Sequence, residues 1–96
     1  MQQISSEQLQ KKLAENCEFF LLDVREEYEH DEFNIGGTLI PLDEVMRKAD
    51  SIPTNKPVVV YCRKGIRSQI AIQRLEQKFG FTNLVNLQGG LEKWKS

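Results

Sequence analysis

The sequence contains few residues that could bind a metal ion or form a disulfide. Among its 96 residues are two cysteines and one histidine. Cys17 and Cys62 lie far apart and form no Cys-X-X-Cys pair, which argues against structural zinc. A disulfide would be unusual in a reducing compartment. We therefore expect two free thiols and no bound metal.

Long apolar segments and an excess of one charge are also absent. The apolar runs, such as residues 19–22 and 58–62, are strand-sized and far short of the roughly 20 residues that cross a bilayer. No signal sequence is visible at the N-terminus, so the expected location is cytoplasmic. The net charge of −1 gives no reason to expect nucleic acid or an anionic membrane as a partner.

The chain shows no repeat, low-complexity tract or linker, and its length is typical of one domain, so we expect residues 1–96 to form a single domain. Ser5 and Gln8 resemble a capping box. The expected elements are a helix over 6–15 carrying Leu9 and Leu13, a strand over 19–24, a short helix over 26–32, a turn at Gly36 and Gly37, a short apolar stretch at 39–40, a brief helix over 43–48 and a strand over 58–61. They continue with a helix whose apolar positions are Ile72, Leu75 and Phe79, a strand over 84–87 and a final short helix carrying Leu91 and Trp94.

Strands that alternate with helices predict an α/β fold with a mostly parallel sheet covered by helices on both faces. Such a sheet places its functional loops at the carboxyl ends of its strands. Cys62 follows the 58–61 strand directly, and a helix comes soon after it. The sequence therefore predicts that Cys62 lies in a functional loop.

This loop is the basic part of a slightly acidic chain. No acidic residue occurs between Asp50 and Glu76, whereas Arg63, Lys64 and Arg67 follow Cys62 closely. Loop amides, a helix N-terminus and nearby cations all favour a thiolate over a thiol. Gly65 suits a loop that needs positive φ or a close approach to a bound group, and Ser68 can cap the helix or donate to the sulfur. Cys62 is thus a candidate nucleophile.

A structural interpretation of each cysteine stands beside the chemical one. Cys62 could be a small buried apolar residue at a strand end, with a solvated basic loop after it. The strand, tight loop and helix around Cys62, with their concentrated positive charge, favour the nucleophile. For Cys17, the nearby Glu15 and Glu18 disfavour a thiolate, so we expect that residue to be chemically inert.

Four motifs in order resemble the rhodanese homology domain over nearly the whole chain. They are Asp23-Val24-Arg25-Glu26, then Ile35-Gly36-Gly37-Thr38 leading to Ile40-Pro41-Leu42, then Cys62 to Arg67 after the 58–61 strand, and finally Leu87-Gln88-Gly89-Gly90-Leu91 with Trp94. The resemblance implies a five-stranded parallel sheet and a sulfurtransferase that carries sulfur as a persulfide on Cys62, with no metal or organic cofactor. The implied donor is a small anion such as thiosulfate, or a protein persulfide, and the implied acceptor is cyanide or a thiol. The implied substrate-binding residues are Arg63, Lys64, Gly65, Ile66, Arg67 and Ser68.

The resemblance is incomplete before the turn, where Asn34 replaces a frequent histidine and Thr38 a frequent alanine. We expect Asn34 to make a polar contact there. The one histidine, His30, lies among acidic residues and is expected to be a solvated helix residue, while Trp94 is expected in the core. Asp23 and Arg25 are expected to form a structural ion pair, or alternatively to shape the rim of the Cys62 pocket.

Two other functions remain open. A cysteine-dependent phosphatase or arsenate reductase would also place a thiolate in an anion-binding loop. In the motif of cysteine-dependent phosphatases, five residues separate the cysteine from the arginine. Here only four residues separate Cys62 from Arg67, which argues against this class. A non-catalytic binding module with the same fold is the second alternative, against which the retained cysteine and basic loop weigh.

Overall fold

A computed structural model describes residues 1–94. Its five strands are β1 (Gln2–Ile4), β2 (Phe20–Asp23), β3 (Thr38–Leu39), β4 (Val58–Tyr61) and β5 (Leu84–Leu87). They form one parallel sheet in the order β1-β5-β4-β2-β3. The predicted parallel α/β fold is therefore confirmed.

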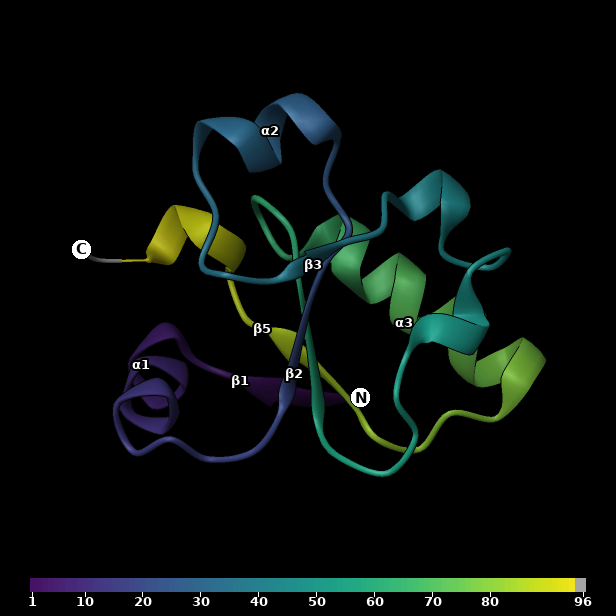
Figure 1. Cartoon of the computed structure of the whole chain (residues 1–96), viewed down its shortest axis with the longest axis horizontal. Helices are drawn as coiled ribbons and strands as arrows, with labels where there is room; N and C mark the ends of the chain where they lie inside the picture. The colour runs from purple at the N-terminus through teal and green to yellow at the C-terminus, as the bar shows by residue number, and fades with distance from the viewer. Residues whose placement is uncertain (95–96) are drawn as a thin grey trace.

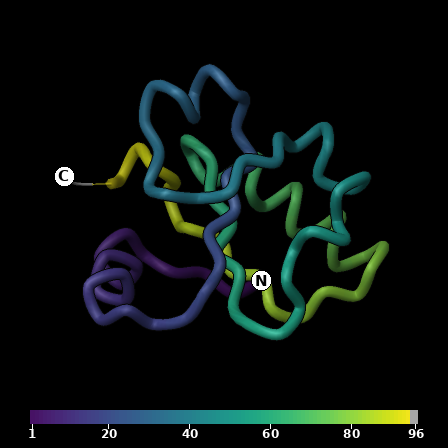
Figure 2. Tube along the Cα trace, viewed as in Figure 1, coloured from purple at the N-terminus to yellow at the C-terminus, as the bar shows by residue number. Residues whose placement is uncertain are grey.

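Helices cover both faces of this sheet (Figures 1 and 2). Helix α1 (Ser6–Ala14) and the 3-10 helix η3 (Gly90–Lys93) lie on one face, and α3 (Ile66–Phe79) lies on the other with the 3-10 helices η1 (Leu42–Glu44) and η2 (Ala49–Ser51). The short α2 (Glu27–Glu32) lies over the carboxyl edge of the sheet. The carboxyl edge of the sheet is therefore covered by α2, which belongs to neither of the two packed faces.

The central strand β4 provides residues to both apolar cores. Val58 and Val60, with Cys62 just after the strand, pack with α3 residues on one face, and Val59 and Tyr61 pack with Leu9 and Leu87 on the other. All four β4 residues are buried, as expected of β-branched and aromatic side chains in a strand with neighbours on both edges. This packing fixes where β4 ends, and Cys62 follows at that point.

Helix boundaries agree with the sequence where caps and apolar spacing are strong. The Ser5 capping box starts α1, and Gly80, with φ of +71°, ends α3. The predicted helix at 43–48 is wrong, because η1 ends at Glu44 and residues 45–48 form turns before η2 begins at Ala49. The final helix is a 3-10 helix. Strand β1 was not predicted, since only one of its three residues is buried.

Three residues that were expected in the apolar core are exposed or only partly buried in the structure. Ile72 and Leu75 are fully buried, but Phe79 in the last turn of α3 is 47% exposed. Leu13 is also exposed, whereas Leu9 on the same helix is buried. Trp94 is only partly buried, against the α1 face of the sheet. Leu13 and Phe79 lie in the last turns of their helices, and Trp94 follows the last turn of η3.

Candidate active site

Cys62 begins a tight loop that connects β4 to α3. The loop turns at Gly65, whose φ of +90° is a conformation that side chains with a Cβ rarely adopt. A Cβ at this position would also lie 3.2 Å from the amide nitrogen of Gly89. Glycine therefore permits the bend that brings the start of α3 back over the cysteine.

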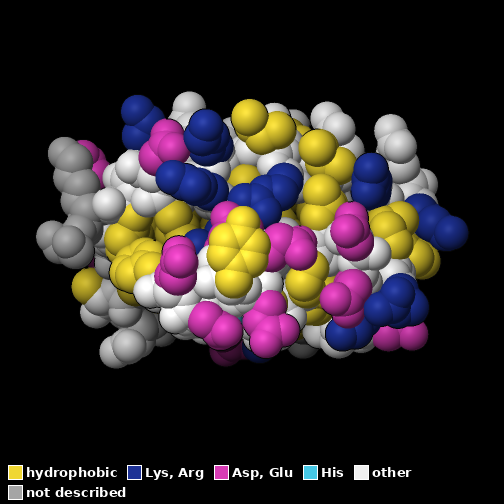
Figure 3. Space-filling model, turned by 90° about the horizontal axis from the view of Figure 1, so that it is seen from above, with side chains coloured by type: hydrophobic (Ala, Val, Ile, Leu, Met, Phe, Trp, Pro, Cys, Tyr) yellow, Lys and Arg dark blue, Asp and Glu magenta, His cyan; other side chains and the backbone are white. Residues whose placement is uncertain are grey.

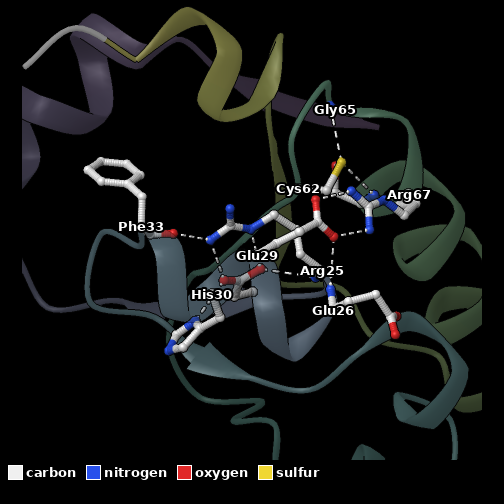
Figure 4. A network of polar contacts seen from close by, with 10 residues as sticks. Arg25, Glu26, Glu29, His30, Phe33, Cys62, Gly65 and Arg67 are labelled. Atoms are coloured by element: carbon white, nitrogen blue, oxygen red, sulfur yellow. Dashed lines mark hydrogen bonds and ion pairs between the residues drawn. The ribbon is translucent and has the colours of Figure 1, made fainter.

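Backbone amides of this loop point at the sulfur. The amide of Gly65 donates to Cys62 Sγ at 3.1 Å, and the amide of Ser68 donates at 3.4 Å (Figure 4 shows the Gly65 contact). The Ser68 hydroxyl lies 3.5 Å from the same sulfur. Cys62 is only 1% exposed, yet it lines a small cavity of about 190 Å³ with Arg63, Lys64, Ile66 and Arg67. Amides at a helix N-terminus stabilise a negatively charged atom at this point.

Ser68 continues into a buried polar chain that the sequence did not indicate. Its hydroxyl donates to Oδ1 of Asn86, and Asn86 Nδ2 donates to Gln3 Oε1 at 2.8 Å. Asn86 is 1% exposed in the middle of the otherwise apolar β5. A buried amide in such a strand requires hydrogen-bond partners, and this requirement is the one signal by which the residue could have been found.

The three basic side chains of the loop differ in their partners. Arg67 forms a two-point ion pair with Glu29 of α2, with N–O distances of 2.7 and 2.9 Å (Figure 4). Arg63 lies 4.0 Å from the carboxylate of Glu92 in η3. Within residues 1–94, Lys64 has no ion-pair partner. The loop is therefore less positive than its own sequence indicates, because the fold brings two carboxylates to it.

A second ion pair attaches the start of α2 to the sheet. Arg25 donates to both carboxylate oxygens of Asp23, at 3.0 and 2.9 Å, and to the carbonyl oxygen of Phe33 at 2.6 Å. Asp23 is fully buried and Arg25 is 5% exposed. The predicted Asp23–Arg25 ion pair is thus present. Arg25 lines a neighbouring cavity together with Arg63, but neither Asp23 nor Arg25 lines the cavity that contains Cys62.

His30 is not the solvated residue that we expected. Its Nδ1 lies 2.8 Å from Asp23 Oδ2, and its side chain is 21% exposed. Burial disfavours the charged form of Asp23, but hydrogen bonds from Arg25 and His30 outweigh this effect and hold the pKa of that carboxyl below its ordinary value. The sequence does not reveal this contact, because the two residues are seven positions apart and lie on different elements.

The turn after α2 is stabilised by Asn34, the residue that departs from the family pattern. Its side-chain amide donates to the His30 carbonyl at 3.0 Å, and its Oδ1 accepts from the Gly36 amide at 2.8 Å. The expected polar contact is present. One contact joins the turn to α2, and the other lies within the turn.

The second cysteine lies outside this site. Cys17 is exposed, and its nearest polar partner is a Glu15 carboxylate oxygen at 3.9 Å. Among the described residues there is also no group of three histidine, cysteine or acidic side chains placed to hold a metal ion. No helix within residues 1–94 is long and apolar enough to span a membrane.

The ion pair between Glu29 and Arg67 predicts how acid affects stability. Hydrogen bonds from Arg67 lower the pKa of Glu29 from 4.5 to about 2, even though burial acts in the opposite direction. A carboxylate with a depressed pKa stabilises the fold fully above its ordinary pKa and loses this contribution as the pH falls through the depressed value. Glu29→Gln is therefore expected to cost about 1–2 kcal/mol at neutral pH. The difference from wild type should shrink as the pH falls from 4.5 towards about 2.

Urea denaturation followed by circular dichroism over this pH range measures the difference. Glu27→Gln is the matched control, because Glu27 is exposed on the same helix and has no ion-pair or hydrogen-bond partner among residues 1–94. Its effect should stay close to zero at every pH. A Glu29→Gln difference that did not change with pH would show that the carboxylate charge is not what stabilises the fold.

A buried cysteine whose sulfur accepts loop amides at the carboxyl edge of a parallel sheet defines the class of this protein, an α/β domain with a cysteine in a strand-to-helix loop. The profile of the rhodanese-like domain matches residues 5–96. The chain therefore belongs to the rhodanese-like family.

Individual relatives agree with this assignment. The chain is 36% identical over 89 residues to the thiosulfate sulfurtransferase GlpE of Coxiella burnetii, covering 88% of this chain and 79% of that protein. It is 43% identical over 75 residues to the uncharacterised protein YqhL of Bacillus subtilis, covering 77% of this chain and 59% of that relative. A crystal structure of a rhodanese-like domain protein from Staphylococcus aureus superimposes with a TM-score of 0.90 at 30% identity, covering 100% of this chain and 93% of that one.

Proposed function

We propose that the protein is a sulfurtransferase that carries a sulfane sulfur as a persulfide on Cys62. The observation that supports this most is the pair of amides, from Gly65 and Ser68, that donate to Sγ at the N-terminus of α3. They stabilise a thiolate before reaction and a negatively charged persulfide after it. Relatives that are named sulfurtransferases support the same assignment.

The proposed reaction has two displacements. The Cys62 thiolate attacks the outer sulfur of a donor such as thiosulfate, the S–S bond of the donor breaks, and sulfite leaves with the bonding electron pair. A thiophilic acceptor, cyanide or a thiolate, then attacks the outer sulfur of the persulfide and regenerates the Cys62 thiolate. No electrons enter or leave the system, so this chemistry requires no metal or organic cofactor.

The residues around Cys62 have separate roles in this proposal. Arg63 and Lys64 attract the anionic donor, and Gly65, Ile66, Arg67 and Ser68 form the wall and the amides that receive the transferred sulfur. Asp23 and Arg25 hold the segment that leads into α2. We propose the cytoplasm as the location, since a reducing compartment keeps Cys62 available as a thiol.

Mass spectrometry of the loaded protein tests the proposal. After incubation with thiosulfate, the protein should become one sulfur atom heavier, and addition of cyanide should release that sulfur as thiocyanate. The two cysteines fall in separate tryptic peptides, residues 13–25 and 49–63, so the modified cysteine can be identified. If neither thiosulfate nor an alkyl persulfide adds sulfur to the 49–63 peptide, the activity is absent and the binding-module alternative is favoured.

A further inference from the structure

Acidic residues from other elements surround the Cys62 loop. Figure 3 shows Lys and Arg side chains interspersed with Asp and Glu on the face that carries α2. Arg67 is paired with Glu29 and Arg25 with Asp23, and Arg63 has Glu92 at 4.0 Å. A donor that approaches Cys62 therefore meets several ion pairs and, within the described residues, one unpaired loop cation, Lys64.

The Arg67–Glu29 ion pair is less exposed and makes more contacts than the Arg63–Glu92 ion pair. Arg63 and Glu92 are 69% and 51% exposed at their side chains, so their pairing is weak. Glu29 is 11% exposed, and its Oε1 also accepts from the Glu26 amide at 3.0 Å. Both carboxylate oxygens of Glu29 bind Arg67. The negative charge of Glu29 is therefore fixed in place by the first turn of α2.

This arrangement affects the charge available to a substrate. Arg67 lines the same cavity as Cys62, but both of its terminal nitrogens are bonded to Glu29. A guanidinium paired in this way contributes little net positive potential to the cavity. Thiosulfate, with two negative charges, gains more from an unpaired cation than a donor with one charge does. The Arg67–Glu29 ion pair therefore reduces the electrostatic advantage that a dianionic donor would have over a singly charged donor in binding near Cys62.

We propose that Glu29 is a specificity-determining residue, which neutralises Arg67 and so favours singly charged sulfane donors over dianionic ones. The preferred class is an alkyl persulfide, whose terminal sulfur Cys62 takes while an alkyl thiolate leaves. This inference rests on the proposed sulfurtransferase function and adds the charge of its donor. It assigns a role to a residue on a helix that does not touch the sulfur.

Two donors of similar shape and different charge test the proposal. Methanethiosulfonate has a methyl group where thiosulfate has a charged oxygen, and it releases methanesulfinate when Cys62 takes its sulfane sulfur. The measurement is the ratio of kcat/KM for thiosulfate to kcat/KM for methanethiosulfonate. Glu29→Gln should raise this ratio about three- to tenfold, because glutamine keeps an oxygen that can accept from the Glu26 amide and removes the charge.

Two further variants separate charge from structure. Glu27→Gln removes a charge from the same helix away from Arg67 and should leave the ratio within about twofold of wild type. The double variant Glu29→Gln, Arg67→Gln removes both charges, so its ratio should return towards the wild-type value whatever its absolute rates. An unchanged ratio in Glu29→Gln, or a double variant that strongly disfavours thiosulfate, would overturn the proposal. The second result would mean that Arg67 binds the dianion despite its partner.

Alkylation of Cys62 provides a readout that needs no sulfur transfer. Iodoacetate is an anion and iodoacetamide is neutral, and both form a thioether with the thiolate and release iodide. The iodoacetate to iodoacetamide rate ratio, measured on the 49–63 peptide, should rise about threefold or more in Glu29→Gln. If no donor loads Cys62, the proposed function fails and donor selection by Glu29 fails with it, although a raised alkylation ratio would still show that Glu29 offsets the charge of Arg67. If donors load Cys62 and neither ratio changes, the inference about Glu29 fails by itself.

Discussion

Cys62→Ser is expected to abolish sulfur transfer from thiosulfate to cyanide, with a loss of at least about a thousandfold. Serine keeps the approximate shape of the side chain, but its hydroxyl is far less acidic than a thiol and cannot form a persulfide. The Gly65 and Ser68 amides would still have an acceptor, so the variant should fold. Thiocyanate release and the mass of the 49–63 peptide measure the two halves of the reaction.

Cys17→Ser is the matched control for this experiment. Cys17 is exposed and lies next to Glu15, so its replacement should leave the rate of thiocyanate formation unchanged. If Cys62→Ser kept a substantial part of the activity while Cys17→Ser lost it, the transferred sulfur would be carried on the other cysteine. The proposed site would then be wrong.

Gly90→Ala should have the largest effect on stability, about 2–4 kcal/mol. Gly90 has φ of +62°, and a Cβ there would lie 2.4 Å from the Arg63 carbonyl oxygen and 2.5 Å from the Cys62 carbonyl oxygen. These are backbone atoms of the Cys62 loop, so they cannot move aside without moving the loop. Urea denaturation measures the loss, and the rate of thiocyanate formation should also fall.

Gly80→Ala separates strain from collision. Gly80 has a similar φ of +71°, but a Cβ there would meet no atom within 4 Å. This variant should lose only about 1 kcal/mol, the cost of left-handed backbone for a residue with a Cβ. Equal losses in the two variants would show that the close approach of Gly90 to the loop does not matter.

Local patterns in the sequence predicted the parts of the structure that depend on neighbours in the chain. The β-branched run before Cys62 predicts strand β4, and the capping box and Gly80 predict the limits of two helices. The position of Cys62 between a strand and a helix follows from these elements. Strand β1 could not be predicted in this way, because its pairing with β5 provides most of what stabilises it.

The electrostatics of the site depend on contacts between distant segments. Arg67 and Glu29 are 38 residues apart, and Ser68 and Asn86 are 18 apart. The sequence around Cys62 shows only the cations, so it overstates the positive charge of the loop. Residues that neutralise an active-site charge can come from any element at the same edge of a sheet, and spacing in one chain does not reveal them.

Helix α2 has no buried residue, and polar contacts link it to the rest of the molecule. Its side chains can therefore change with little cost to the apolar packing on either side of the sheet. Under the proposed function, a rhodanese-like domain built in this way can adapt to a sulfur donor of different charge by exchanging charged residues on a six-residue surface helix, while Cys62 and its amides stay as they are.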